Sequence, residues 1–237
     1  MILRLLLFYV SCMLFTEAKS QCYIAEDGLI RFSNFLWVEK VTSIKVGPGP
    51  NYFGLHKKNV FVDRLGNLHL SLKKKQTHWS CAEVITDSIL KEGVYEVSFY
   101  SNNTIPNNVV FGLFLYDTEN PPSYNEIDFE LSKWNVPEGL NAQHVVHSNK
   151  DFIVNRFDLP KVQDETKHIF KVYSDSIFIS SYATNPLNLL QNSVFRRPKA
   201  FNLKQAKFRM NLWLIKSPVE EQEPFEVVIT SFNYRAF

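Results

Sequence analysis

Short runs of apolar or alternating residues, separated by turn-forming residues, extend along most of this chain, and none shows a long helical period. Side chains on a strand alternate between its two faces, so such runs are typical of β-strands. We expect strands over twelve segments: 35–38, 59–63, 68–72, 79–86, 93–100, 109–116, 126–132, 142–147, 168–173, 176–182, 207–215 and 225–232. About twelve strands without long helices predict an all-β sandwich.

The first twenty residues have the pattern of a secretory signal peptide. Arg4 supplies a positive charge, residues 5–15 an apolar stretch, and residues 18–20 a small-residue cleavage pattern. The apolar stretch is shorter than the ~20 residues that a membrane-spanning helix needs. We therefore expect residues 1–20 to be removed and residues 21–237 to form a single secreted domain without a membrane anchor.

The charge balance gives no reason to expect nucleic acid or an anionic membrane as a partner. The chain has 26 Lys and Arg against 24 Asp and Glu, a formal net charge of +2. Apolar residues make up 45% and aromatic residues 14%, which indicates a folded globular domain. We see no internal repeat or linker, and we expect a monomer.

Two cysteines, Cys22 and Cys81, would remain once the leader is removed. In an oxidising compartment they could form a disulfide, and closing a loop of about 60 residues would add up to ~4 kcal/mol. The alternative is a buried thiol at Cys81 and an exposed thiol at Cys22. The one glycosylation sequon begins at Asn102 and is used if the host glycosylates its secreted proteins.

Three carboxylates alternate with three large apolar residues in the segment 125–131, Asn-Glu-Ile-Asp-Phe-Glu-Leu. On a strand, Glu126, Asp128 and Glu130 would share one face, while the apolar residues would anchor the other. Like charges on one face repel, so a sequence that keeps them together is expected to use them. The alternatives are a solvated polar face and a cation site with carboxylate ligands.

Glycoside hydrolysis is a reaction that needs paired carboxyl groups. They flank the sugar bond, roughly 5 Å apart when the anomeric configuration is retained. Long side chains at Glu126 and Glu130 can converge on a curved strand. The charge of Asp128 between them would raise the proton affinity of a neighbour, so that one Glu keeps a proton as general acid while the other stays ionised.

The segment Glu126-Ile-Asp-Phe-Glu130 resembles the signature strand of glycoside hydrolase family 16, which contains lichenases, laminarinases and xyloglucan endotransglycosylases. Further segments resemble, in the right order, those of the same family: 47–53, 59–63, 66–70 and 79–84 before this strand and Met-Asn-Leu-Trp at 210–213 after it. The resemblance spans nearly all of residues 21–237. It implies a concanavalin A-like jelly roll of two curved antiparallel sheets with a sugar cleft on the concave face.

The resemblance also implies catalytic roles. Glu126 would be the nucleophile, Glu130 the acid and base, and Asp128 the group that holds a proton or hydrogen bond between them. Trp213 and Asn211 would lie on the cleft face and contact sugar, and Glu83 and Gln143 would hydrogen-bond sugar hydroxyls. Trp134 would be a second stacking platform or an ordinary core residue, whereas Trp79 is expected to be structural.

A metal cofactor is not predicted. His144 and His147 are three residues apart in an expected strand, so they point to opposite faces, and no Cys or His partner follows at ligand spacing. This pattern argues against catalytic zinc. Structural calcium occurs in many members of the family that this chain resembles, but no loop rich in Asp and Asn identifies such a site here.

The sequence predicts a secreted, retaining endo-glycosidase that acts on a β-linked glucan polysaccharide. No extra residue separates Asp128 from Glu130, so the strand resembles the regular form of lichenases rather than the bulged form of many laminarinases. A transglycosylase would share the same glycosyl-enzyme intermediate. A non-catalytic glucan-binding protein on the same fold is the alternative from another class, and all three carboxylates favour the enzyme.

Overall fold

The computed structural model describes residues 29–55, 59–117, 125–148, 151–160, 163–198, 201–216 and 222–237. All regular structure within these residues is β-strand, which confirms the predicted class. The strands are β1 (Ile30–Phe32), β2 (Phe35–Glu39), β3 (Tyr52–Phe53), β4 (Val60–Val62), β5 (Leu68–Lys75), β6 (His78–Thr86), β7 (Gly93–Tyr100), β8 (Val109–Asp117), β9 (Asn125–Ser132), β10 (Ala142–Ser148), β11 (Asp151–Phe157), β12 (Thr166–Val172), β13 (Ser176–Thr184), β14 (Leu187–Arg196), β15 (Lys207–Leu214) and β16 (Phe225–Ala236).

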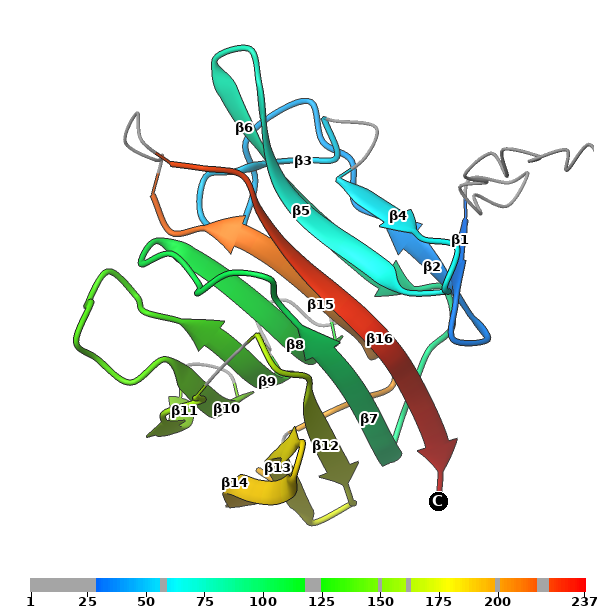
Figure 1. Ribbon diagram of the computed structural model, residues 1–237. Coiled ribbons are helices and arrows are strands. Elements are labelled where there is room, and N and C mark those ends of the chain that lie inside the picture. The colour runs from blue at the N-terminus through cyan, green and yellow to red at the C-terminus, as the bar shows by residue number, and fades with distance from the viewer. Residues whose placement is uncertain are drawn as a thin grey trace, which may run out of the picture.

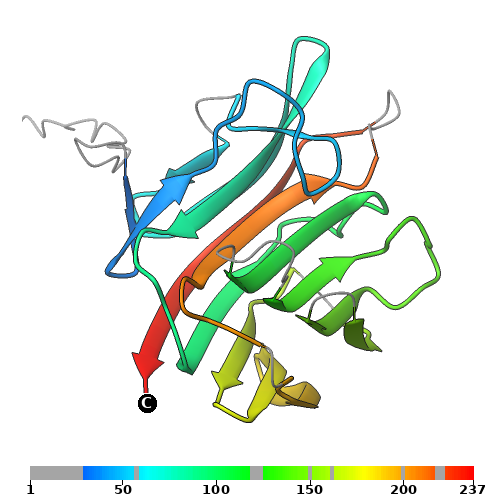
Figure 2. The same cartoon turned by 180° about the vertical axis from the view of Figure 1, so that it is seen from behind.

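The strands pair along one path that folds over into two curved layers. The order is β11-β10-β9-β8-β15-β6-β5-β16-β7-β12-β13-β14, and the short strands β1 to β4 pair at its sides. The layer with β16 and β7 is in front in Figure 1, and the layer with β15, β8 and β9 is in front in Figure 2. All pairs are antiparallel except β3 with β6. This is the predicted jelly roll.

Aromatic residues from the two layers meet in the core between them. Phe99 on β7 packs against Phe111 on β8 with ring centroids 4.7 Å apart. Phe208 on β15 packs against Phe232 on β16 at 4.9 Å. On β9 the apolar residues Ile127, Phe129 and Leu131 are fully buried. The carboxylates that alternate with them must therefore face the opposite side of this layer.

Four strands were not expected from the sequence: β1, β3, β11 and β14. The last two are the edges of the folded-over sheet, so each pairs on one side along this path. On β14, the apolar residues Leu187 and Leu189 are exposed. An edge strand with apolar residues turned to solvent lacks the clean alternation of a half-buried strand, which explains why the pattern did not reveal it.

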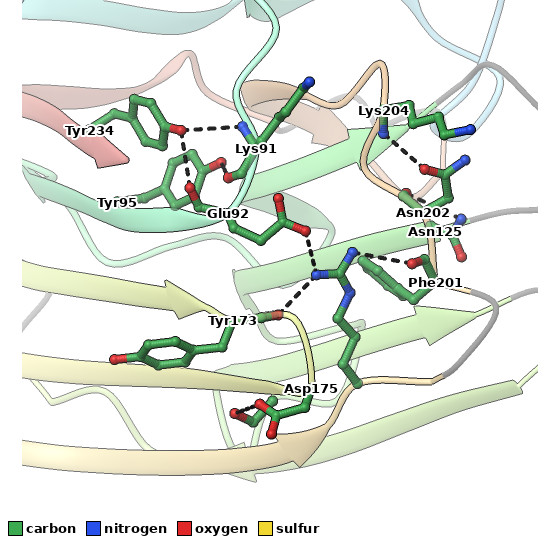
Figure 3. Close-up of polar contacts among 12 residues, drawn as sticks. Lys91, Glu92, Tyr95, Asn125, Tyr173, Asp175, Phe201, Asn202, Lys204 and Tyr234 are labelled. Atoms are coloured by element: carbon green, nitrogen blue, oxygen red, sulfur yellow. Dashed lines mark hydrogen bonds and ion pairs between the residues drawn. The ribbon is translucent and has the colours of Figure 1, made fainter. Parts of the chain in front are cut away.

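Arg197, one residue after β14, connects three parts of the chain at one end of the sandwich. Its Nη1 donates to Glu92 Oε1 at 2.7 Å and to the carbonyl of Tyr173 at 2.9 Å, and its Nη2 donates to the carbonyl of Phe201 at 3.2 Å (Figure 3). These contacts hold the segment that leads into β15, the strand that presents Asn211 and Trp213.

Several predictions on the N-terminal part of the chain concern residues outside the described ones. The signal peptide at 1–20 and Cys22 belong to this part, so the single domain over 21–237 and the Cys22–Cys81 disulfide stay predictions. Cys81 is a fully buried thiol, and burial raises its pKa to about 12. Asn102 is exposed in the turn after β7. No helix among the described residues is long and apolar enough to cross a membrane.

Candidate active site

Glu126, Asp128 and Glu130 all line one cavity of about 440 Å³ on the outer face of the layer that contains β9. The strand pairs with β8 and β10 in continuous register without a bulge, as the spacing of the triplet predicts. The remaining lining residues come from the segment between β2 and β3 and from β6, β8, β10 and β15: Lys40, Gly47, Pro48, Glu83, Gly112, Phe114, Tyr116, His147, Arg209, Asn211 and Trp213.

Burial and mutual repulsion raise the pKa values of two of the three carboxyl groups. Asp128 is only 4% exposed, and its pKa is raised well above its usual value by desolvation, then by the charges of Glu126 and Glu130 and a hydrogen bond with Glu126. Desolvation also raises the pKa of Glu130 to about 7, with a smaller contribution from Glu126. A carboxyl group with a pKa of about 7 can donate and accept a proton at neutral pH.

The sequence predicted that the charge of Asp128 would raise the pKa of a neighbouring Glu. In the structure the main cause at Glu130 is burial, and the charge that adds to it belongs to Glu126. The reason is that Asp128 is the most deeply buried of the three, so desolvation raises its pKa and favours its uncharged form.

Glu130 is the end of a chain of polar contacts that crosses from β9 to β11. Gln143 on β10 donates from Nε2 to Glu130 Oε2 at 2.5 Å, and Arg156 Nε donates to Gln143 Oε1 at 3.1 Å. The Arg156 guanidinium lies over the ring of Trp134, 5.0 Å from its centroid. Both the hydrogen bond and the positive charge stabilise the Glu130 carboxylate and oppose the effect of burial.

Glu83 lies on the other side of the cavity, 1% exposed, between two cations. Lys40 Nζ is 2.8 Å from Glu83 Oε2, and Arg209 Nη1 is 3.2 Å from Glu83 Oε1. Lys40 also donates to the carbonyl of Gly47 at 2.7 Å. The predicted site residue Glu83 is therefore in the cavity, but it is held by two basic residues that the sequence did not single out.

Asn211 and Trp213 line the cavity from β15, as the resemblance implied. Gly112 on β8 stands between Asn211 and Glu130, directly opposite each of them in register. A Cβ at Gly112 would lie 2.7 Å from Asn211 Oδ1. The absence of a side chain at Gly112 thus makes room for the Asn211 amide beside the catalytic candidate Glu130.

The Gly-Pro-rich segment at 47–50 forms a turn that is part of the cavity wall. Asn51 Nδ2 donates to the carbonyls of Pro48 and Leu214, at 2.9 and 2.8 Å. Gly49 has a φ of +61°, and a Cβ there would lie 2.8 Å from the Leu214 carbonyl oxygen and 3.5 Å from the Trp213 ring. Glycine therefore lets this segment pack closely against the end of β15 and the indole.

Three buried polar atoms of the cavity lack a hydrogen-bond partner among the described residues: Asp128 Oδ2, Arg209 Nε and Asn211 Oδ1. Buried polar groups are nearly always paired, so such atoms gathered in one cavity need an explanation. A ligand that carries several hydroxyl groups could supply donors and acceptors to all three.

Trp134 and Trp79 differ in their surroundings. Trp79 is partly buried and packs against the core, which agrees with its expected structural role. Trp134 is outside that core and outside the cavity lining; it lies in the turn after β9 with a φ of +44°, under Arg156. Among the described residues, Trp134 is thus not part of the hydrophobic core, so the expectation that it is an ordinary core residue is wrong. Its role as a stacking platform for sugar stays a prediction.

The two histidines on β10 point to opposite faces, as predicted. His144 is fully buried between the layers, whereas His147 lines the cavity opposite Glu126. One ligand atom each of Glu126, Asp128 and His147 lies within 4.8 Å of the others, so these side chains could hold a cation. Desolvation lowers the pKa of His147, which favours the neutral imidazole.

No protein-family model and no curated protein matches the chain. Among solved structures, the β-glucanase of Bacillus licheniformis aligns with a TM-score of 0.63 at 17% identity, over 86% of this chain and 94% of the other. A lichenase from a mouse hindgut metagenome aligns with 0.64 at 15% identity, over 92% and 98%. An immunostimulatory antigen and pseudo β-1,3-glucanase of Mycobacterium tuberculosis aligns with 0.64 at 16% identity, over 82% and 88%.

These alignments cover nearly the whole length of each neighbour at low identity, so they establish the fold and not the activity. The expected resemblance to the lichenase-like glycoside hydrolases therefore holds at the level of the fold. The chain therefore has the jelly-roll fold of the β-glucanases.

Proposed function

We propose that this protein is a retaining endo-glycosidase that hydrolyses a β-linked glucan. The observation that carries the proposal is the triplet on β9: three carboxyl side chains in one cavity, of which Asp128 and Glu130 have raised pKa values. A retaining mechanism needs one ionised carboxylate and one carboxylic acid on either side of the scissile bond. Glu126 and Glu130 are the two groups that fit these roles.

In the first step, the Glu126 carboxylate attacks the anomeric carbon while Glu130 gives its proton to the departing glycosidic oxygen. The bond from the anomeric carbon to that oxygen breaks, and an ester to Glu126 forms. Asp128, in its uncharged form, adds no negative charge beside Glu126 and orients the nucleophile through their hydrogen bond.

In the second step, the Glu130 carboxylate takes a proton from a water molecule, which attacks the anomeric carbon and releases Glu126. Glu130 ends the cycle protonated, as it began. Gln143 and Arg156 stabilise the charged form of Glu130 that this step requires. The opposing effects of burial and hydrogen bonding keep its pKa near 7, where both directions of proton transfer are accessible.

The polysaccharide would lie along the cavity with its hydroxyl groups toward the polar wall. Glu83, held between Lys40 and Arg209, accepts hydrogen bonds, and Arg209 Nε and Asn211 Oδ1 offer the unpaired donor and acceptor. Trp213 offers an indole face for stacking against a sugar ring. We propose export of the protein by the leader at 1–20, since such polymers lie outside the cytoplasm.

Reducing-sugar release by the purified protein on lichenan, laminarin, xyloglucan, agarose and carrageenan tests the proposal. Wild type should release sugar from one or more glucans, and Glu126→Gln should not. Sodium azide separates the two roles: with Glu126→Ala it should yield a glycosyl azide of inverted configuration, and with Glu130→Ala one of retained configuration. Equal rates for wild type and Glu126→Gln would rule out the assignment.

A non-catalytic glucan-binding protein is the second candidate function. The observation that favours it is that a solved neighbour with a TM-score of 0.64 is described as a pseudo β-1,3-glucanase. In that case the panel would be silent while one polysaccharide retains the protein in a pull-down. A transglycosylase would instead lengthen its products when an acceptor sugar is added.

A further inference from the structure

His147 is the one histidine of the described residues that lines the cavity, and it lies directly opposite Glu126 in the register of β9 and β10. Directly paired residues on antiparallel strands have Cβ atoms about 4.5–5.5 Å apart. Asp128 is two residues along the same face of β9. One nitrogen and two carboxylate oxygens from two adjacent, rigid strands thus converge, within 4.8 Å of one another.

The pair Asp128 and His147 has a distance that suits a shared cation better than a hydrogen bond. Asp128 Oδ2 and His147 Nε2 are 3.6 Å apart, which is too long for a direct hydrogen bond. Two ligands on one tetrahedral zinc ion, each about 2.0–2.1 Å from it, lie roughly 3.4 Å apart. Asp128 is 4% exposed, and its Oδ2 has no hydrogen-bond partner among the described residues.

We propose that Glu126, Asp128 and His147 form a binding site for one Zn²⁺ ion. An imidazole nitrogen with carboxylate oxygens is a donor set that zinc accepts, whereas calcium prefers six to eight oxygen ligands. The neutral imidazole is the form of His147 that can donate a nitrogen lone pair to zinc. Two carboxylates supply the charge that neutralises the ion, and Asp128 releases its proton when the ion binds.

The sequence indicated a cation site with carboxylate ligands on this strand as one alternative, but it did not indicate that His147 contributes to it. Glu126 and His147 are 21 positions apart, and only the pairing of β9 with β10 brings them together. The ion would take the lone pairs of the proposed nucleophile. Zinc would therefore inhibit hydrolysis reversibly; this consequence rests on the proposed function, whereas the binding itself does not.

The test is a calorimetric titration of the metal-free protein with Zn²⁺ alone at pH 7. We expect one ion per chain. Loss of an outer-sphere partner alone typically costs about 10–100-fold in metal affinity. Loss of a ligand in His147→Gln or in Glu126→Gln should therefore reduce the affinity at least about tenfold.

Two matched variants separate this site from other effects. His78→Gln removes an exposed histidine on β6, outside the cavity, and should leave binding unchanged. Glu130→Gln removes a cavity carboxyl outside the trio and should still bind one ion. Circular dichroism confirms that each variant is folded, and if His147→Gln fails this check, Glu126→Gln decides.

Equal affinities of wild type and His147→Gln would overturn the proposal, and so would the absence of binding to wild type. If His78→Gln bound fewer zinc ions per chain than wild type, the ion would bind at the surface near His78. This result would also contradict the proposal. If the protein hydrolyses a glucan, Zn²⁺ should inhibit wild type, a chelator should restore it, and His147→Gln should need at least about tenfold more zinc. If every polysaccharide fails, calorimetry still decides the zinc site.

Discussion

Gln143 Nε2 donates a hydrogen bond of 2.5 Å to Glu130 Oε2 from the position directly opposite Glu130 on β10. This bond stabilises the ionised form of Glu130 against the burial that raises its pKa to about 7. Gln143 is in turn held by Arg156 on the edge strand β11. A residue two strands away thus contributes to the proton affinity of the proposed acid and base, alongside the larger effect of burial.

Gln143→Ala should move the basic limb of the pH profile of kcat/KM to higher pH. That limb reports the loss of the Glu130 proton in the free protein. Removing a hydrogen bond to the carboxylate disfavours the ionised form, so the pKa rises, by up to about one unit for a bond worth ~1.4 kcal/mol. The measurement is kcat/KM on the glucan that the panel identifies, from pH 4 to pH 9.

Arg156→Gln should also move the basic limb to higher pH, but by less than Gln143→Ala. The positive charge of Arg156 lowers the pKa of Glu130 less than the hydrogen bond from Gln143 does. Lys171→Gln, which removes an exposed cation from β12, serves as the control and should leave the limb in place. A downward shift in Gln143→Ala would contradict the role assigned to Glu130.

Asp128→Asn should retain far more activity than Glu126→Gln. Burial raises the pKa of Asp128 well above its usual value and so favours the protonated, uncharged form, which a neutral amide of the same shape can replace in the hydrogen bond to Glu126. We expect kcat to fall by no more than about a hundredfold, the cost of slight misplacement of the nucleophile. Glu126→Gln should lose at least about 10⁴-fold. If the two variants were equally inactive, the ionised form of Asp128 would be required.

Gly112→Ala should reduce activity without unfolding the protein. The new Cβ would lie 2.7 Å from Asn211 Oδ1, the end of a side chain that can rotate away from the cavity. The substitution should therefore cost as much as Asn211→Ala and cost nothing further in the Asn211→Ala background. A double-mutant cycle on kcat/KM measures this coupling, with thermal unfolding as the control for the fold. Additive losses would show that Gly112 acts by another route.

The sequence predicted the residues whose position follows from strand alternation. Glu126, Asp128 and Glu130 share one face because they are two apart, and the apolar residues between them are buried. Asn211 and Trp213 reach the cavity for the same reason. Twelve expected strand segments each overlap an observed strand, because half-buried strands with turn residues at their ends carry a clear pattern.

The sequence did not predict the cavity residues whose position depends on the order of the strands in the sheet. Arg209 meets Glu83, 126 positions away, because β15 lies beside β6. Lys40 and His147 likewise reach the cavity only through the fold. Gly112 did leave a signal, since a glycine in the middle of an apolar strand marks a close approach by another group.

Two neutral histidines in the core should make the protein acid-sensitive. His144 Nδ1 and Nε2 lie 2.8 and 2.9 Å from the hydroxyls of Ser193 and Ser181, and His168 Nδ1 lies 2.8 Å from Ser181. His168 Nε2 meets Thr166 Oγ1 at 3.0 Å. The Ser181 hydroxyl lies between the two rings and can donate to one and accept from the other, so the series is satisfied when both imidazoles are uncharged.

Desolvation lowers the pKa of His144 to about 3. Desolvation also lowers the pKa of His168 well below its usual value, and the nearby His144 lowers it further. The unfolded chain binds protons near pH 6.5, and the folded chain does not, so the unfolded state holds more protons below that pH. The free energy of unfolding is therefore at its full value above pH 6.5 and falls as the pH drops toward 3. Each histidine contributes up to about 1.4 kcal/mol per pH unit.

Urea unfolding at pH 7, 6 and 5 measures this slope. His144→Gln keeps a donor and an acceptor for the two serines but cannot be protonated, so its stability should fall less steeply with acid than that of wild type. His78→Gln, which removes an exposed histidine, should follow the wild-type slope. If His144→Gln were as acid-sensitive as wild type, the loss of stability would have to come from other groups, such as the carboxylates Asp63 and Glu226, whose pKa values are lowered in the folded state.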